Sequence, residues 1–237
     1  MTAQLVLLRH GHSEWNLSNR FTGWTDIPLT EQGLNEAAQA GQLLRAAGWH
    51  FDEIHISVLQ RTRQTAESLL QAMQHPPVPV LASWRLNERH YGALQGLNKQ
   101  EIFTAWGEEQ SFKWWRGYAE RPPALDEDDP RHPRFDALYQ AHPALHLPAT
   151  ESLADCLQRL LPYWYETLVP RIQDQRRVLL ISHGNTLRGL LMHLLDLSPR
   201  AVESLEIPSA VPLICHLDQH GKLIQLQEGL NGNTPTT

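Results

Sequence analysis

LVLLRHGHSEWN, residues 5–16, is an apolar run that ends abruptly in an Arg-His-Gly turn. VLLISHGNTLRG, residues 178–189, ends in the same way in a Ser-His-Gly turn. Short, wholly apolar runs are typical of strands that are buried on both faces of a parallel sheet. His10 and His183 are therefore predicted to lie at the carboxyl ends of two such strands, where open α/β sheets bind their ligands.

Around these two turns, strand patterns alternate with helix patterns. Thr30 can cap a helix that Gly48 can end, and its apolar residues follow a 3.6-residue period: Leu34, Ala37, Ala38, Gly41 and Leu44. Further helices are predicted over residues 60–73, 98–118, 151–168 (kinked at Pro162) and 185–197. Strands are predicted over residues 4–8, 52–59, 176–182, 211–218 and 221–227, with a short one after the Pro-rich residues 75–80. This order predicts an α/β fold with a mostly parallel central sheet flanked by helices.

The middle of the chain departs from this alternation. Residues 119–150 are rich in proline and contain the acidic run DEDDP, which predicts a long loop. With the helix before them they form an excursion over about residues 98–150, which is either a cap over the site or an unstructured linker. We therefore expect a single domain over residues 1–226 and a flexible tail over residues 227–237.

Composition argues against several classes of function. The net charge of −6, without any basic run, argues against nucleic-acid binding. No apolar run approaches the roughly 20 residues that span a bilayer, and the N-terminus lacks the pattern of a secretion signal. No membrane association and a cytoplasmic location are therefore expected. The two cysteines, Cys156 and Cys215, form no metal-binding pattern and are expected to be small buried residues.

The residues that follow the predicted strand ends indicate a phosphate site. Arg9 precedes the first histidine, and Arg61 and Arg63 follow a third strand at the start of a helix. Arginine side chains and helix N-termini both bind phosphate. Because guanidinium groups disfavour the protonated form of a nearby imidazole, His10 can attack phosphorus as a neutral nucleophile.

A phosphoryl transfer also needs an acid that protonates the leaving oxygen. The candidate is Glu88, which lies between two arginines in RLNERHYGALQGLNK, residues 85–99. The alternative role for such a glutamate is a solvated ion pair. A metal site at His10 and His12 is conceivable, but no matching set of ligands follows, so no metal is expected.

These motifs resemble the histidine phosphatase superfamily and, within it, the cofactor-dependent phosphoglycerate mutases. The resemblance covers the chain to about residue 226 and implies a histidine-phosphatase-like (phosphoglycerate-mutase-like) fold. The Arg-His-Gly turn is shared by the superfamily. The mutase branch is indicated by NRFTGWTDIPLTEQG, LNERHYGALQGLNK, WRGY followed by RPP, TESL, PYW, SHGNTLR and IPSAVP.

The resemblance implies an isomerase of glycolysis and gluconeogenesis that interconverts 3-phosphoglycerate and 2-phosphoglycerate through a phosphohistidine on His10. 2,3-Bisphosphoglycerate would be the priming phosphate donor, and no metal would be needed. Glu88 would be the general acid and base, and the phosphate would be surrounded by Arg9, Arg61 and His183. The residues implied to bind substrate are Ser13, Asn16, Thr22, Gly23, Arg89, His90, Tyr91, Lys99, Arg116, Gly184 and Asn185. Related mutases are commonly dimers or tetramers, so a homo-oligomer is expected, with a dimer favoured.

Three departures from the family pattern keep alternatives open. His12 stands where the family has glutamate, Trp115 stands where it has the first of two arginines, and the longer C-terminal segment of these mutases is missing. The second departure removes a charge-assisted bond worth roughly 1.5–3 kcal/mol, and the third bears on water exclusion at the site. One alternative is a phosphatase that acts on bisphosphoglycerate or another small phosphate ester through the same phosphohistidine. Another is a protein that binds such ligands without turnover.

Overall fold

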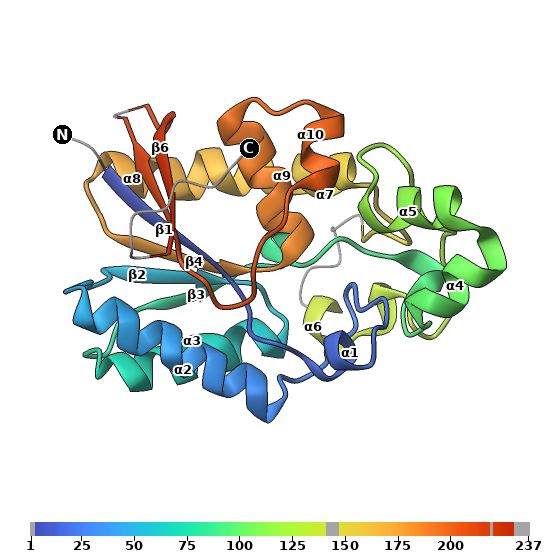
Figure 1. Ribbon diagram of the computed structural model, residues 1–237, viewed down its shortest axis with the longest axis horizontal. Helices are drawn as coiled ribbons and strands as arrows, with labels where there is room; N and C mark the ends of the chain where they lie inside the picture. Colours follow the sequence, from blue (N-terminus) through green and yellow to red (C-terminus); the bar gives the residue numbers. More distant parts are fainter. Residues whose placement is uncertain (1–2, 141–146, 219, 230–237) are drawn as a thin grey trace.

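The computed structural model describes residues 3–140, 147–218 and 220–229, and its centre is a six-stranded sheet (Figure 1). The strands are β1 (Ala3–Arg9), β2 (Glu53–Ile56), β3 (Val80–Ala82), β4 (Val178–Ser182), β5 (Leu213–Leu217) and β6 (Leu223–Glu228). Their order across the sheet is β3-β2-β4-β1-β5-β6. The first four in this order are parallel, whereas β5 and β6 are antiparallel to their neighbours. The prediction of a mostly parallel sheet is confirmed.

The two apolar runs form the centre of the sheet. β1 pairs with β4 in a register that places Leu5 beside Val178 and Arg9 beside Ser182. The two His-Gly turns therefore leave the sheet side by side. Every apolar residue from Leu5 to Leu8 and from Val178 to Ile181 is fully buried, as expected for strands covered on both faces.

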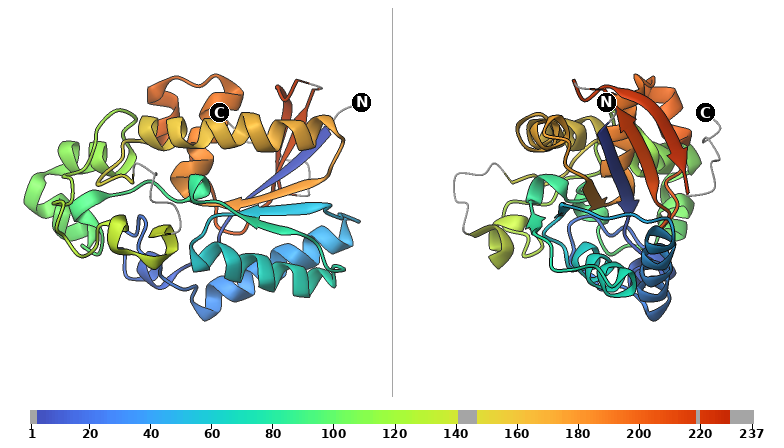
Figure 2. Two further views of the ribbon diagram at one scale, coloured as in Figure 1. Left: turned by 180° about the vertical axis from the view of Figure 1, so that it is seen from behind. Right: turned by 90° about the vertical axis from the view of Figure 1, so that its left-hand side faces the viewer.

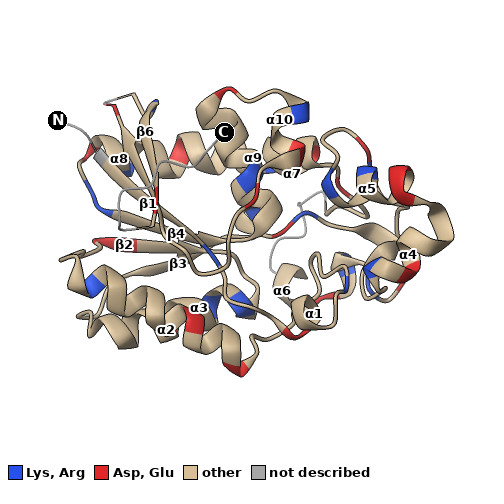
Figure 3. Cartoon of the chain, in the orientation of Figure 1, with Lys and Arg blue, Asp and Glu red and all other residues tan. Residues whose placement is uncertain are grey.

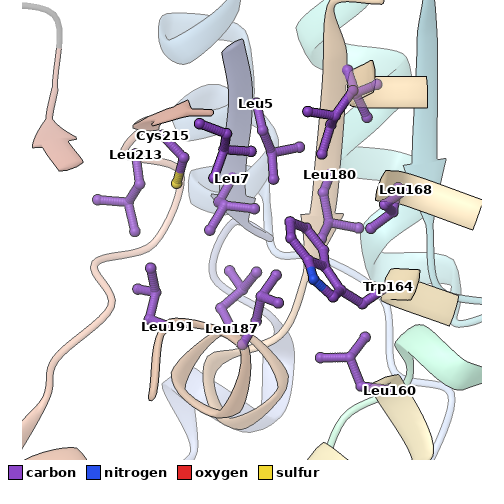
Figure 4. Close-up of a cluster of buried hydrophobic side chains, with 14 of the residues drawn as sticks. Leu5, Leu7, Leu160, Trp164, Leu168, Leu180, Leu187, Leu191, Leu213 and Cys215 are labelled. Atoms are coloured by element: carbon purple, nitrogen blue, oxygen red, sulfur yellow. The ribbon is translucent and has the colours of Figure 1, made fainter. Parts of the chain in front are cut away.

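Helices cover both faces of the sheet, as Figures 1 and 2 show. One face carries α2 (Glu31–Ala46) and α3 (Gln60–Met73), and the other carries α7 (Leu153–Tyr163), α8 (Val169–Gln173) and α9 (Gly184–Leu195). Alternate residues of each strand point to opposite faces. Leu7 and Leu180 therefore pack with Trp164 in one cluster (Figure 4), and Val6 and Ile181 pack in the other.

Helix α2 begins and ends near the predicted residues. The Thr30 hydroxyl accepts a hydrogen bond from the backbone N–H of Gly33 at 3.0 Å, and Gly48 follows the helix with a φ of 76°. The predicted apolar face is partly wrong, because Leu34 is 37% exposed and Ala40 is buried in its place. Helix α2 packs most closely against α3, where Gly41 contacts the backbone of Leu69. The face of α2 that is buried against α3 therefore carries small residues.

The predicted helix over residues 98–118 is two helices, α4 (Lys99–Trp106) and α5 (Glu108–Arg116). Gly107 separates them with a φ of 78° and a ψ of 161°, a backbone conformation that favours glycine and ends α4. Residues 119–150 contain η3 (Pro133–Phe135) and α6 (Ala137–Gln140) and are therefore not an unstructured linker where the structure describes them. Residues 141–146 lie outside the described residues. The shorter elements elsewhere are α1 (Glu14–Leu17), η1 (Trp84–Leu86), η2 (Gly92–Leu94) and α10 (Pro199–Ser204).

Pro162 lies inside α7, and the helix continues after it as a π-helical segment, η4 (Trp164–Leu168), before α8. Proline has no backbone N–H to donate, and shortly after Pro162 the helix changes from α-helical to π-helical hydrogen bonding. This change of helix type stands where the kink was predicted. β6 ends at Glu228, two residues into the predicted tail, and residues 230–237 lie outside the described residues. Within the described ranges, no helix has the length and apolar character needed to cross a membrane.

Candidate active site

A polar cavity lies at the carboxyl ends of β1, β2 and β4, between the sheet and the α4–α5 pair. Among the predicted site residues it is lined by Arg9, His10, Asn16, Thr22, Gly23, Arg61, Glu88, Tyr91, Lys99, Arg116, Gly184 and Asn185. In Figure 3, Lys and Arg segments of α3, α4, α5 and α9 surround this end of the sheet. The fold therefore gathers residues from most of the chain length at one place.

His10 follows β1 and is held as a neutral imidazole. Its Nδ1 lies 2.7 Å from the carbonyl oxygen of Gly11, so Nδ1 carries the proton and donates it there. Nε2 is then the unprotonated nitrogen with a free lone pair. Burial, followed by the charges of Arg61 and Arg9, holds the pKa of His10 well below its usual range. The ring is thus prepared to act as a nucleophile.

His183 follows β4 and packs edge-on against His10, with ring centroids 5.0 Å apart. Its Nε2 lies 2.8 Å from the Ser57 hydroxyl, and its Nδ1 accepts a hydrogen bond from Nε of Arg61 at 3.2 Å. Burial and the Arg61 charge keep the pKa of His183 well below its usual range. His183 is fully buried and is not among the cavity-lining residues, so it stands behind His10 and Arg61.

Arg9 and Arg61 supply the positive charge beside His10. Arg61 donates to the carbonyls of Thr25 and Gly23 at 3.0 and 2.8 Å, and burial lowers its pKa to about 10, so it remains charged. Arg9 donates through Nη1 to the Ile207 carbonyl at 2.8 Å. Its Nε is buried and meets no acceptor among the residues that the structure describes. An unsatisfied buried donor in a cavity of guanidinium groups fits an anionic ligand such as phosphate.

Glu88 lines the cavity at the start of helix α9. Its Oε1 accepts hydrogen bonds from the backbone N–H groups of Arg89, at 2.8 Å, and Asn185, at 3.2 Å. The second donor belongs to the first turn of α9, where the helix dipole favours negative charge. One oxygen is thus fixed, and the other can exchange a proton with a ligand.

The side of the cavity formed by α4, α5 and residues 205–207 carries what we call the outer cluster: Lys99, Trp115, Arg116 and Glu206. Lys99 Nζ lies 5.2 Å from the Trp115 ring centroid, and the Arg116 guanidinium lies 5.5 Å from it. Burial and the Arg9 charge lower the pKa of Lys99 to about 8. Trp115, which replaces a cation of the family pattern, therefore lines the cavity between two cations.

Three predicted substrate-binding residues do not line the cavity. Arg89 is fully buried, and its guanidinium donates to the carbonyls of Glu151, Gly117 and Glu120. Ser13 caps α1 through the backbone N–H of Asn16. His90 Nδ1 accepts from the Gly92 N–H, and burial lowers the pKa of His90 to about 3.

These three side chains bind the backbone of the surrounding loops and lie outside the cavity lining. Arg63, the second arginine of its helix start, is exposed and lies 4.0 Å from Glu67. It also takes no part in the cavity.

Residues that the sequence reasoning did not assign also line the cavity: Arg20, Arg188, Glu206 and Ile207. Arg188 follows the second His-Gly turn by one helical turn, and this spacing was a usable signal. The backbone carbonyls of Gly11 and Ile207, which orient His10 and Arg9, leave no trace in residue type. Backbone carbonyls that orient a side chain can therefore be identified only from the folded structure.

His12 does not point at His10. Its Nδ1 lies 2.8 Å from Oε1 of Glu36 on α2, and its backbone N–H donates to Oε2 of the same carboxylate at 3.0 Å. These hydrogen bonds lower the pKa of Glu36. The charge of a protonated His12 is only the smallest of the influences on the pKa of His10. The histidine at this position therefore pairs with Glu36 and not with His10.

The 119–150 part of the excursion does not line this cavity where it is described. Residues 130–139 instead form a second hollow with Trp24 and Gln95. Of the excursion, α4 and α5 therefore contribute to the site, whereas the described part of residues 119–150 does not line it. Across residues 3–140, 147–218 and 220–229, no group of three or more His, Cys, Asp or Glu side chains is placed to hold a metal ion.

The fold and this cavity define an α/β protein with a candidate phosphoryl-transfer site. The sequence profile of the histidine phosphatase superfamily (branch 1) matches residues 5–130 and 124–228. A 2,3-bisphosphoglycerate-dependent phosphoglycerate mutase of Bacteroides fragilis is 48% identical over 211 residues, which are 89% of this chain and 85% of the relative. The chain belongs to the histidine phosphatase superfamily and, within it, to the family of this mutase.

Solved structures agree with the fold. YhfR of Bacillus stearothermophilus superposes with a TM-score of 0.71 at 25% identity, covering 98% of each chain. A mycobacterial glucosyl-3-phosphoglycerate phosphatase in complex with VO3 gives a TM-score of 0.67 at 25% identity, covering 90% of this chain and 92% of that one. The predicted fold class and family resemblance are confirmed.

Proposed function

We propose that this enzyme interconverts 3-phosphoglycerate and 2-phosphoglycerate through a phosphohistidine on His10, primed by 2,3-bisphosphoglycerate. The observation that carries the proposal is the state of His10. A neutral ring with its Nδ1 proton donated to Gly11 points an unprotonated Nε2 into a cavity that Arg9 and Arg61 make positive. The name of the 48%-identical relative supports the choice of substrate.

In the first half-reaction, His10 Nε2 forms a bond to phosphorus while the bond from phosphorus to the ester oxygen breaks. Glu88, in its protonated form, gives its proton to that leaving oxygen. The Gly11 carbonyl accepts the Nδ1 proton throughout and so stabilises the ring as it gains positive character. Arg9 and Arg61 offset the charge on the transferring oxygens, with Arg9 Nε as the free buried donor.

In the second half-reaction, a substrate hydroxyl attacks the phosphorus held on His10, and the bond between nitrogen and phosphorus breaks. Glu88 takes the proton of the attacking hydroxyl, so the carboxyl group returns to its protonated form. 2,3-Bisphosphoglycerate supplies the phosphoryl group that first loads His10. Lys99 and Arg116 in the outer cluster fit the second anionic group of such a ligand, because both are cationic and line the same cavity.

The test is a paired assay with 3-phosphoglycerate, with and without catalytic 2,3-bisphosphoglycerate, following 2-phosphoglycerate and inorganic phosphate together in the presence of a chelator. We expect stimulated isomerisation with little phosphate release. His10→Ala should abolish acid-labile, covalently bound phosphate; turnover of that variant at the parent rate would refute the nucleophile. Glu88→Gln should slow transfer while phosphate still binds, and an unchanged rate would leave Glu88 as a residue that only anchors the backbone N–H groups of Arg89 and Asn185.

A phosphatase that uses the same phosphohistidine is the second candidate, and Trp115 is the observation that favours it. The outer cluster has one guanidinium fewer than the family pattern, and this weakens the hold on a bisphosphorylated intermediate that must return a phosphoryl group to His10 before it leaves. A solved structure at 25% identity is named as a glucosyl-3-phosphoglycerate phosphatase. Phosphate release without isomerisation would select this reading.

We also propose a cytoplasmic enzyme that forms a homodimer. The dimer comes from the family resemblance, and the location from the role in central carbon metabolism. Analytical ultracentrifugation of the full chain would show the assembly: a single species of twice the chain mass supports the dimer, and one of 27.1 kDa excludes it.

A further inference from the structure

Glu206 is an exposed carboxylate at the edge of the active-site cavity. Its side chain is 77% exposed, and its Oε1 lies 3.0 Å from Nη1 of Arg116. The same guanidinium donates through Nε to the Glu203 carbonyl at 2.9 Å and through Nη2 to the Leu205 carbonyl at 2.7 Å. All three nitrogens of Arg116 are therefore engaged by residues 203–206 before any ligand binds.

The outer cluster consequently carries less available positive charge than its residue types suggest. Trp115 contributes no formal charge, and Glu206 offsets the charge of Arg116 at a distance of an ion pair. Lys99, held over the Trp115 ring, is the remaining cation of the cluster. At the other end of the cavity, Arg9 (β1) and Arg61 (α3) donate to backbone carbonyls. Within the described residues neither forms an ion pair with a carboxylate, although the charges of Glu88 and Asp26 act on Arg61 from a longer distance.

We propose that Glu206 is a specificity-determining residue that disfavours a second phosphate group at the outer cluster relative to a carboxylate or hydroxyl group. A phosphate carries about −1.5 to −2 at neutral pH, so it would compete with Glu206 for Nη1 of Arg116 and be repelled by the carboxylate. A singly charged group is repelled less, and an uncharged group is not repelled. This inference rests on the proposed function only for the identity of the ligand.

The consequence for turnover is a loose hold on bisphosphorylated ligands. A bisphosphoglycerate formed in the cavity would leave more often before returning its other phosphate, so more of it would be needed in solution to keep His10 loaded. Glu206 would thereby set the level of 2,3-bisphosphoglycerate at which isomerisation is half-stimulated.

The test compares two ligands in a background that cannot transfer phosphate. Inorganic phosphate and 2,3-bisphosphoglycerate are titrated by calorimetry into His10→Ala and into His10→Ala combined with Glu206→Gln, at low ionic strength. We expect Glu206→Gln to tighten bisphosphoglycerate binding about tenfold and inorganic phosphate binding less than twofold. An equal change for the two ligands, or no improvement for bisphosphoglycerate, would overturn the proposal.

Two further variants separate position from charge. Glu206→Asp keeps the charge and should leave the ratio of the two dissociation constants within about threefold of the parent. Glu101→Gln removes the same charge from an exposed position of α4, away from the cavity lining, and should not change the ratio. If Glu101→Gln tightened the binding of 2,3-bisphosphoglycerate as much as Glu206→Gln does, the change in net charge would be the cause, and the proposal would be refuted. Phosphohistidine formation in the parent protein tests the proposed function separately.

Discussion

At the scale of single residues, the protonation states of the cavity are set by burial and by neighbouring guanidinium groups. The pKa values of His10 and His183 lie well below their usual range, whereas those of Arg61 and Arg188, about 10 each, leave both charged at neutral pH. Burial and the Arg9 charge lower the pKa of Lys99 to about 8, which is close to physiological pH. One residue therefore controls how the cavity responds to mildly alkaline conditions.

Affinity for 3-phosphoglycerate should fall as the pH rises from 7.5 to 9. Lys99 loses its proton through about pH 8, while the histidines are already neutral and the arginines titrate only above this range. The phosphate of the ligand has its second pKa near 6 and is fully ionised in this window. Calorimetric titration across the range should show the loss, and Lys99→Arg should abolish it. A parent protein with constant affinity from pH 7.5 to 9 would contradict the assignment.

Trp115→Arg should tighten the binding of 2,3-bisphosphoglycerate by about tenfold or more, because it restores a charge-assisted bond worth roughly 1.5–3 kcal/mol. The side chain lines the cavity, so the new guanidinium can reach a ligand there. Competition against the loading of His10 would measure the effect, with Trp106→Arg as the control, since Trp106 is 58% exposed and lies outside the cavity. An unchanged affinity would show that the tryptophan is tolerated without loss.

At the scale of secondary-structure elements, the Arg-His-Gly turn that follows β1 is held in place by direct backbone contact with α2. A Cβ at Gly33 would overlap the carbonyl oxygen of His12, and a Cβ at Gly11 would overlap the carbonyl of Gly33. Thr30 adds a hydrogen bond from its backbone N–H to the His12 carbonyl at 2.9 Å. The start of α2 thus determines where the turn presents His10.

Gly33→Ala should destabilise the protein by about 1–3 kcal/mol through overpacking, lowering the Tm by roughly 3–10 °C, and should also reduce phosphohistidine formation. Gly189→Ala is the matched control, because a Cβ there makes ordinary contacts with Leu157 and Leu153. Because Gly189 lies in the middle of α9, Gly189→Ala should stabilise the protein by about 0.5–1 kcal/mol. Calorimetric unfolding of both variants would measure the difference; equal effects would contradict the backbone contact.

At the scale of the whole molecule, the fold encloses several histidines in neutral form. His10, His90 and His183 are buried, and burial is the largest cause that lowers each pKa. In the unfolded chain these rings titrate near pH 6.5. The unfolded state therefore binds more protons than the folded state below this pH, and stability must fall as the pH decreases.

These three histidines alone should decrease the free energy of unfolding by about 3 kcal/mol between pH 6.5 and pH 5.5, at roughly 1 kcal/mol each, and the lowered pKa values of His55, His132 and His193 act in the same direction. Urea unfolding at pH 7.5, 6.5 and 5.5 would measure it. The carboxylates with lowered pKa values, Glu36 and Asp52 among them, lose their contribution only at lower pH. A stability that stays constant down to pH 5.5 would show that the histidines take up protons in the folded state.

The sequence alone predicted the α/β sheet, because residues 5–8 and 178–181 are short, wholly apolar runs, and such runs are typical of strands buried on both faces. It also predicted His10, Arg9 and Arg61 as cavity residues, since their motifs follow strand ends, and Glu88, because phosphoryl transfer needs an acid. It did not predict the break at Gly107, which depends on one backbone dihedral angle, or the exposure of Leu34, which depends on where α3 packs.

Only the tertiary structure decided which charged side chains face the cavity. Arg89 and Arg116 both follow family motifs, yet the guanidinium of Arg89 is surrounded by backbone carbonyls, whereas that of Arg116 lines the cavity beside Glu206. Strand ends can be predicted because burial leaves a local apolar pattern in the sequence. The partners of a guanidinium cannot, because they come from segments far away in the chain and include backbone carbonyls, which every residue carries.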